Sequence, residues 1–183
     1  MRSVVIPTRF NRDTLAPLVD ACKKVAQVVL VHTEPGHEDV PGTVTVRNYE
    51  RNIHTWWNVG LNQCDGPTLI LNDDITATPD ALTALFDALD SADLVYLDGK
   101  RGRTPLSGWC YGIHPDGRLR PDESFTWWFG DDDIWQRAQR QNATVTVLDL
   151  PQIRHVSRST AFEDPKMQEA AGWDRALYLR RWS

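Results

Sequence analysis

The stretch Thr68-Leu69-Ile70-Leu71-Asn72-Asp73-Asp74 joins an apolar run to polar and acidic residues without a break. Asp65-Gly66-Pro67 precedes it as a turn, so the apolar run has the bounds and length of a buried strand. Acids at the end of a buried strand are costly unless they are solvated, paired or bound to a cation. The stretch therefore predicts a strand that ends at a polar site. Its acids either hold a cation or cap the turn and helix that follow.

Similar apolar runs lie on both sides of this stretch, and most alternate with helical patterns. The pair Thr78-Pro79 is typical of a helix start, with Thr78 as the N-cap and Pro79 at the first helical position. Asp13 is a second candidate cap. Short strands alternating with helices predict an α/β domain, a Rossmann-like, mostly parallel sheet sandwiched by helices. Strands are expected at 4–6 (stopped by Pro7), 28–31, 43–46, 68–71, 93–97, 107–113 and, as the last, 144–150; helices are expected at 13–25, 53–62, 78–89 and after 133.

Polar residues follow three of these strands at the point where each one ends. They form the clusters Pro7-Thr8-Arg9, His32-Thr33-Glu34 and Asn72-Asp73-Asp74. Ligands of open parallel sheets bind at the carboxyl ends of the strands. The three clusters are therefore expected to meet at one edge of the sheet.

The totals suit one domain. The chain has 183 residues, of which 41% are hydrophobic and 25% charged, as in ordinary globular proteins. We interpret 1–98 as a nucleotide-binding half, 99–160 as an acceptor and catalytic-base half with a small β/helix region, and 161–183 as a helical tail. The tail either packs on its own domain or serves a partner or a second copy.

Charge and cysteine content bear on partners and compartment. The net charge of −5 provides no global attraction for nucleic acid. The three cysteines have no paired or metal-binding spacing, which is typical of a reducing compartment. We also expect no leader segment and no transmembrane segment, because no apolar run approaches about 20 residues. These features predict a cytoplasmic protein.

A second acidic cluster, Gly130-Asp131-Asp132-Asp133, follows the aromatic pair Trp127-Trp128. Asp residues favour helix N-termini, so at least one of the three acids is expected to be a cap. Aromatic rings beside a carboxylate also make a wall that holds a sugar and raises the pKa of a general base. His155 is a third candidate for a functional residue, although a lone His is more often a packed or surface residue. Arginines suited to a diphosphate are Arg101, Arg103, Arg154 and Arg158.

The order of these elements resembles that of family 2-like glycosyltransferases of the GT-A fold. The resemblance covers about residues 3–160. It implies that Asn72-Asp73-Asp74 stands at the Asp-x-Asp metal motif, with Asn72 in place of its first acid. It also implies that Asn58-Val59-Gly60 matches the Asn-x-Gly helix beneath the nucleotide. The nucleotide- and donor-binding residues implied are Pro7, Thr8, Arg9, His32, Thr33, Glu34, Asn58, Asn72, Asp73, Ser107, Gly108 and Trp109.

The resemblance implies the chemistry as well. Asp131 or Asp132 would be the catalytic base, and Trp127 and Trp128 would stack on the acceptor sugar. Mn²⁺ or Mg²⁺ would be the cofactor. The metal ligands implied are Asp74, His155 and Asp73.

The function expected from this resemblance is metal-dependent, inverting transfer of a sugar from a nucleoside diphosphate sugar to a hydroxyl. The donor would be of UDP or GDP type and the acceptor a saccharide or protein, with a homodimer as one way to complete the acceptor site. Two alternatives remain open, namely a metal-dependent phosphoesterase or nucleotide hydrolase, and a non-catalytic nucleotide-sugar binding module.

Overall fold

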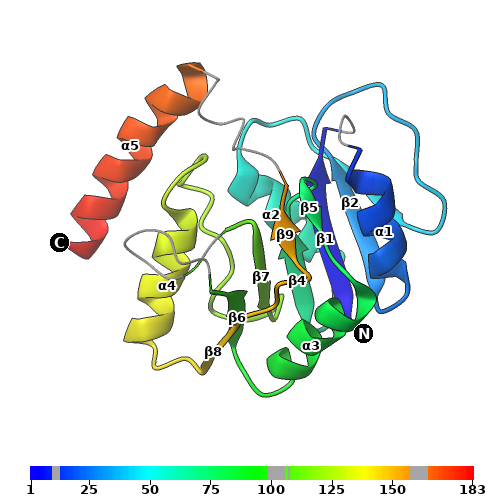
Figure 1. Ribbon diagram of the computed structural model, residues 1–183. Coiled ribbons are helices and arrows are strands. Elements are labelled where there is room, and N and C mark those ends of the chain that lie inside the picture. The colour runs from blue at the N-terminus through cyan, green and yellow to red at the C-terminus, as the bar shows by residue number, and fades with distance from the viewer. Residues whose placement is uncertain (10–12, 99–105, 107, 157–164) are drawn as a thin grey trace.

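The computed structural model describes residues 1–9, 13–98, 106, 108–156 and 165–183. Its centre is a seven-stranded sheet with the order β3-β2-β1-β4-β7-β6-β8, and helices lie on both faces (Figure 1). A second, two-stranded sheet pairs β5 with β9. The predicted α/β fold with a mostly parallel sheet is confirmed.

The described residues form short strands and five helices, in an order that alternates through most of the chain. The strands are β1 Ser3–Thr8, β2 Gln27–His32, β3 Val44–Arg47, β4 Thr68–Leu71, β5 Ile75–Thr76, β6 Leu94–Leu97, β7 Cys110–Ile113, β8 Val145–Leu148 and β9 Arg154–His155. The helices are α1 Leu15–Lys23, α2 Ile53–Leu61, α3 Pro79–Leu89, α4 Gly130–Arg140 and α5 Pro165–Trp182.

One strand of the large sheet runs against the others. β1, β2, β3 and β4 are mutually parallel, and β6 is parallel to β8. β7 lies between β4 and β6 and is antiparallel to both. The residue before β7, Trp109, therefore lies at the same edge as the carboxyl end of β4, as the 2.9 Å hydrogen bond from Asn72 N–H to the Trp109 carbonyl shows.

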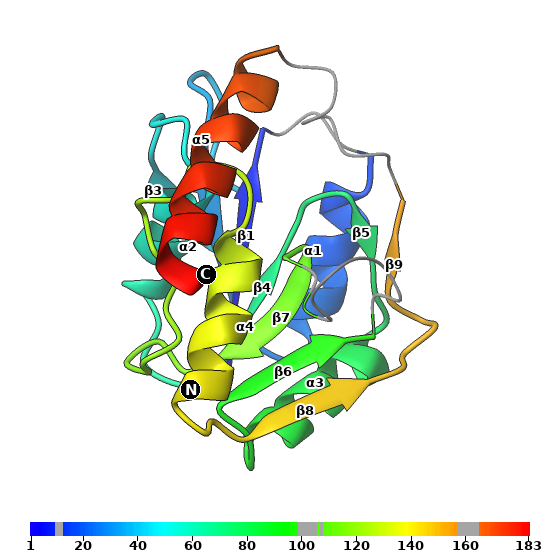
Figure 2. The same ribbon diagram turned by 90° about the vertical axis from the view of Figure 1, so that its left-hand side faces the viewer.

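Alternate side chains of each strand build two separate cores. Val4 and Ile6 of β1 join α1 and α3 on one face, while Val5 joins α2 and α4 on the other. Figure 2 shows α2 and α4 together on one face, with α5 packed outside α4. The α2 helix lies so close to the sheet that a Cβ at Gly60 would be 2.3 Å from Val5 Cγ1. Both faces of the sheet are thus covered, which is why the inner strands β1, β4, β7 and β6 are buried along their whole length.

Several expected element bounds need correction. β1 does not stop at Pro7 but continues to Thr8, because β1–β4 pairing ends at Val5 and the missing N–H of proline is not needed there. The N-cap of α1 is Thr14 and not Asp13. The strand at 145–148 is not the last one, since β9 follows it. Thr78 does cap α3, and its hydroxyl accepts a hydrogen bond from Ala81 N–H.

Candidate active site

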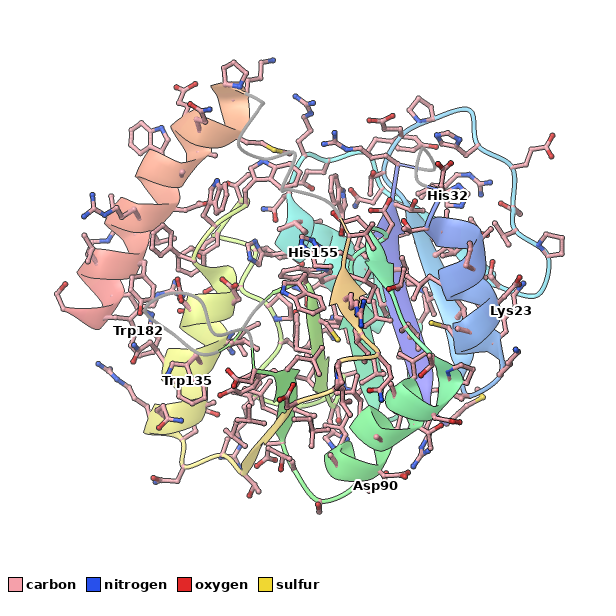
Figure 3. All side chains as sticks on the ribbon, in the orientation of Figure 1. Lys23, His32, Asp90, Trp135, His155 and Trp182 are labelled. Carbon is pink, nitrogen blue, oxygen red and sulfur yellow. The ribbon has the colours of Figure 1, made fainter. Side chains whose placement is uncertain are left out.

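The carboxyl ends of β1 and β2 are joined by hydrogen bonds from a single residue. Thr33 donates to the Thr8 carbonyl from both its backbone N–H, at 3.0 Å, and its hydroxyl, at 3.1 Å. Beyond them, Arg9 and Glu34 face each other at 3.7 Å on the surface. His32 is buried at the end of β2 (Figure 3), and burial lowers its pKa, with Arg47 nearby as a second cause. The first two predicted clusters therefore lie side by side.

The acidic segment after β4 is attached to the same edge. The Thr8 hydroxyl donates to Asp73 Oδ2 at 2.9 Å. The Thr14 hydroxyl, at the N-cap of α1, donates to the Asp73 carbonyl at 2.6 Å. Thr14 was missed in the sequence because its hydroxyl bonds a residue 59 positions away and not its own helix. The third predicted cluster thus meets the first, with Asp73 as the link.

Asp74 faces a histidine from a distant part of the chain, and a tryptophan stacks on that histidine. Its Oδ1 lies 3.0 Å from His155 Nε2, and its carbonyl accepts a hydrogen bond from Val156 N–H at 2.8 Å. The Trp109 ring is stacked on the His155 ring, with centroids 5.4 Å apart. The Asp74 side chain is only 9% exposed, so it needs these partners or a cation. The β5–β9 pairing, absent from the sequence expectations, is what brings His155 to Asp74.

Asp131 lies in the first turn of α4 and contacts the segment that leads into β7. Its Oδ2 accepts a hydrogen bond from Gly108 N–H, and its Oδ1 one from Asp132 N–H, each at 3.0 Å. A Cβ at Gly108 would come within 3.1 Å of Oδ2, so this approach suits glycine. Burial, followed by the charge of Asp132, raises the pKa of Asp131 to about 6. A carboxylate with such a pKa suits a general base near neutral pH.

The third acid of the cluster has a structural role. Asp133 is fully buried and accepts hydrogen bonds from Arg137 Nε at 2.8 Å, Arg181 Nη1 at 2.9 Å and Trp182 Nε1 at 2.9 Å. It joins α4 to α5. Asp132 is partly buried beside Asp131. Of the two candidate bases, Asp131 is the one that contacts Gly108 and whose pKa is raised by burial.

Two other predicted groups have protein partners that suggest structural roles. The Asn58 amide donates to the Pro121 carbonyl and Glu123 Oε1, both at 2.9 Å, and its Oδ1 accepts from Arg120 Nε at 3.2 Å. It supports the segment that precedes α4, and a nucleotide contact from Asn58 stays a prediction. The aromatic pair also packs internally, with the Trp127 ring against Trp56 and Trp128 Nε1 donating to the Met167 carbonyl. Sugar stacking by this pair likewise stays a prediction.

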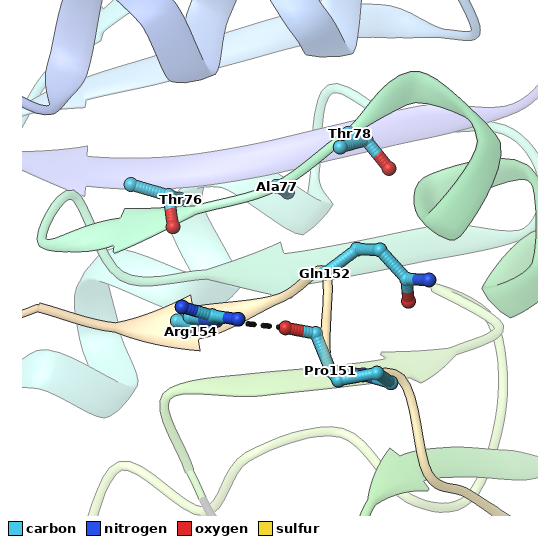
Figure 4. A pocket seen from close by; sticks show the side chains of 6 residues that line it. All are labelled: Thr76, Ala77, Thr78, Pro151, Gln152 and Arg154. Carbon is cyan, nitrogen blue, oxygen red and sulfur yellow. Dashed lines mark hydrogen bonds between the residues drawn. The ribbon is translucent and has the colours of Figure 1, made fainter.

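A cavity of about 440 Å³ lies beside β5 and β9 (Figure 4). Arg154 lines it, with its Nε donating to the Pro151 carbonyl at 2.9 Å. Arg154 is one of the arginines predicted for a diphosphate, but none of the other predicted nucleotide-binding residues lines this cavity, although His155 is the next residue along β9. Of the remaining predicted residues, Ser107, Arg101, Arg103 and Arg158 lie outside the described residues.

Comparison with solved structures identifies the fold. The chain superposes on the structure of S. aureus TarS 1–349 with a TM-score of 0.62 at 16% identity, covering 81% of this chain and 58% of that structure. It matches 2-C-methyl-D-erythritol 4-phosphate cytidylyltransferase from Thermus thermophilus with a TM-score of 0.58 at 13% identity, covering 95% and 97%. For the Streptococcus pneumoniae glycosyltransferase GlyE the TM-score is 0.53 at 12% identity, covering 99% and 62%.

These matches confirm the predicted GT-A-like fold, which the chain shares with sugar transferases and nucleotidyltransferases. The chain spans less than two thirds of TarS and of GlyE. No protein-family model and no curated protein matches the sequence. No helix among the described residues is long and apolar enough to cross a bilayer. The predicted cytoplasmic location remains a prediction.

Proposed function

We propose that this protein is a metal-dependent, inverting glycosyltransferase that moves a sugar from a nucleoside diphosphate sugar to a hydroxyl group. The observation that carries the proposal is the position of Asp131. A carboxyl with a pKa near 6 contacts Gly108, whose neighbour Trp109 stacks on His155, and His155 faces Asp74. One short segment before β7 thus connects a base to an acid–imidazole pair.

The Asp74–His155 pair fits a divalent cation. The separation of 3.0 Å between Asp74 Oδ1 and His155 Nε2 suits two neighbouring ligands of one ion. Among the described residues no three His, Cys, Asp or Glu side chains converge as a metal site. The remaining ligands would therefore be phosphate oxygens of the donor and water, as is usual for Mg²⁺ in nucleotide enzymes. Direct ligation by Asp73, which accepts the Thr8 hydroxyl, stays a prediction.

Each group then has a defined task. Asp131 removes the proton of the acceptor hydroxyl, whose oxygen attacks the anomeric carbon. The bond from that carbon to the diphosphate breaks on the opposite side, which inverts the configuration. Asp74 and His155 would hold Mn²⁺ or Mg²⁺, which would supply positive charge to stabilise the departing diphosphate. Thr8, Thr33 and the 72–74 segment, joined by hydrogen bonds, shape the nucleotide side of the site.

Nucleotidyl transfer is a second candidate, favoured by the match to a cytidylyltransferase over 95% of the chain. In that reaction the attacking group would be a phosphate oxygen. A phosphate is already ionised near neutral pH and needs no general base. The raised pKa of Asp131 therefore favours a hydroxyl nucleophile and glycosyl transfer.

Thermal unfolding with UDP, GDP and TDP sugars, each with and without Mn²⁺, tests the proposal. A ligand at a hundred times its Kd stabilises by about 2.7 kcal/mol. For a chain of this length that raises the Tm by roughly 5–11 °C. We expect one nucleotide to give such a shift only with metal, and Asp74→Asn or His155→Ala to remove it. The absence of any shift across the panel would count against every nucleotide-dependent role.

Product analysis separates the reactions. Glycosyl transfer releases a nucleoside diphosphate, whereas nucleotidyl transfer releases pyrophosphate from a nucleoside triphosphate. We expect Asp131→Asn to abolish transfer while the nucleotide-induced Tm shift persists. Near-normal turnover in that variant would exclude Asp131 as the base and make Asp132 the residue to test. Hydrolysis of the nucleotide without need of an acceptor would instead support a phosphoesterase.

A further inference from the structure

The α5 helix carries one buried carboxylate, that of Asp174, which is 2% exposed. Its Oδ1 accepts a hydrogen bond from Thr126 N–H at 3.0 Å. Its Oδ2 accepts from Trp127 N–H at 2.9 Å and from Trp128 N–H at 3.0 Å. Three consecutive backbone donors around one carboxylate form an anion-binding concavity, and they compensate the burial of the charge. A side chain 46 to 48 positions away thus fixes this loop.

The loop held by Asp174 leads directly to Asp131. Its next residue, Phe129, has the left-handed conformation (φ 61°), which is unusual for a bulky residue. Such a conformation persists where surrounding contacts over-determine it. The Tyr178 ring of α5 packs against the Phe129 ring with centroids 5.3 Å apart. Gly130 and Asp131 then begin α4. The start of α4, and with it the Asp131 carboxylate, depends on a backbone path that α5 holds from outside.

Further contacts of α5 act on the same segment. Arg181 bonds Asp122 at 2.7 Å, before the loop, and Asp133 at 2.9 Å, after it. Arg181 bonds side-chain carboxylates on either side of the loop, whereas the Asp174 carboxylate bonds the backbone N–H groups of the turn itself. It can therefore set the path of the loop without contributing to the chemistry.

We propose that Asp174 is a positioning residue for the base Asp131, holding residues 126–128 so that α4 begins where its first turn meets Gly108. The inference rests on the proposed function, in which Asp131 receives the acceptor proton. Asp131 itself bonds only nearby backbone N–H groups, of Gly108 and Asp132, so its location follows the start of α4. A helix start displaced by a fraction of an ångström would move the base relative to the acceptor while leaving the nucleotide side intact.

The test compares Asp174→Asn and Asp174→Glu with Glu169→Gln. Glu169 is an exposed acid on the same helix, so its variant removes an equal charge without touching the loop. A misplacement of about 1 Å costs roughly a hundredfold in rate. For Asp174→Asn we expect kcat to fall about 10- to 100-fold, with the donor KM within about twofold of the original. Asp174→Glu, which keeps the carboxylate, should recover part of the loss.

Two readouts separate positioning from a general loss of structure. Amide hydrogen exchange at residues 126–128 should become about tenfold faster in Asp174→Asn while exchange in β1 and β4 is unchanged. Water entering at the start of α4 should also lower the pKa of Asp131 from about 6 toward its ordinary 3.8. Asp132 on α4 and Tyr111 on β7 also interact electrostatically with Asp131, and both residues remain in the variants.

Failure of this inference is distinguishable from failure of the proposed function. If the original protein transfers sugar and Asp174→Asn matches Glu169→Gln in kcat, exchange and pH profile, Asp174 has no positioning role. If the original protein transfers no sugar, carbon NMR titration of Asp131 and the exchange rates still show whether Asp174 positions Asp131. Unchanged values in Asp174→Asn would refute the inference, and the two expected shifts would support it. If Asp174→Asn does not fold, Asp174→Glu supplies the same comparison.

Discussion

Replacement of Gly130 by alanine tests the packing at the start of α4, next to the proposed base Asp131. A Cβ at Gly130 would lie 1.8 Å from His54 Nε2, 2.4 Å from Cδ2 and 2.6 Å from Cε1. The His54 ring is buried and has little room to retreat, because its Nδ1 lies 2.8 Å from the Phe125 carbonyl oxygen and its edge packs on Trp57. The start of α4 or the ring must therefore move.

The size of the effect follows from two opposing contributions. Overpacking a core costs about 1–3 kcal/mol, and a Cβ that would come so close belongs at the upper end. Alanine recovers at most about 1 kcal/mol in helix propensity. We expect Gly130→Ala to lower the free energy of unfolding by about 2 kcal/mol, which for a chain of this length lowers the Tm by roughly 4–8 °C. Urea denaturation followed by circular dichroism measures the change.

Gly172 provides the matched control. It lies within α5, and a Cβ there would have no atom within 4 Å. Gly172→Ala should therefore stabilise by about 0.5–1 kcal/mol through propensity alone. In a His54→Ala background the penalty of Gly130→Ala should largely disappear. Gly130→Ala as stable as the original protein, or equally harmful with His54 removed, would refute the proposed contact.

Two further predictions concern the same core and the base. Gly60→Ala should destabilise by about 1–3 kcal/mol, because its Cβ would lie 2.3 Å from Val5 Cγ1, and urea denaturation showing stabilisation would contradict the close approach of α2 to the sheet. The pKa of Asp131 is raised from 3.8 to about 6, so between these values the folded protein keeps a proton that the unfolded chain has lost. The stability from Asp131 is thus complete below pH 3.8 and is lost as the pH rises through 6. Asp131→Asn should flatten this part of the stability–pH curve, and an unchanged slope in denaturation between pH 4 and 6 would show that the pKa is not raised.

The elements that sequence predicted best are those with a local cause. Thr78-Pro79 combines an N-cap with a favoured first helical residue, and α3 begins at Pro79. The apolar run 68–71 is bounded on both sides, and β4 has those bounds. The expectation that polar clusters meet at the carboxyl edge needed only the parallel order of the strands. It is confirmed by the Thr8–Asp73 contact.

The remainder depended on contacts between distant residues. β5 and β9 have two residues each, too few for any periodicity to show, yet they bring His155 to Asp74. Asp174 is one of two acids in α5, and nothing in the local sequence distinguishes it from the exposed Glu169. The role of Asp133 was equally hidden, because its partner Arg181 lies 48 positions away.

Because synthesis runs from the N-terminus, the hydrogen bonds from the 126–128 turn to Asp174 form late. The three donors leave the ribosome well before their acceptor, which is added 46 to 48 residues later. At about 5–20 residues per second that interval lasts roughly 2–10 seconds. During this interval β1, β2 and β4 have already been synthesised, while residues 126–128 lack the carboxylate of Asp174. The nascent chain can therefore form the edge where β1, β2 and β4 end before the segment that carries Asp131 is anchored.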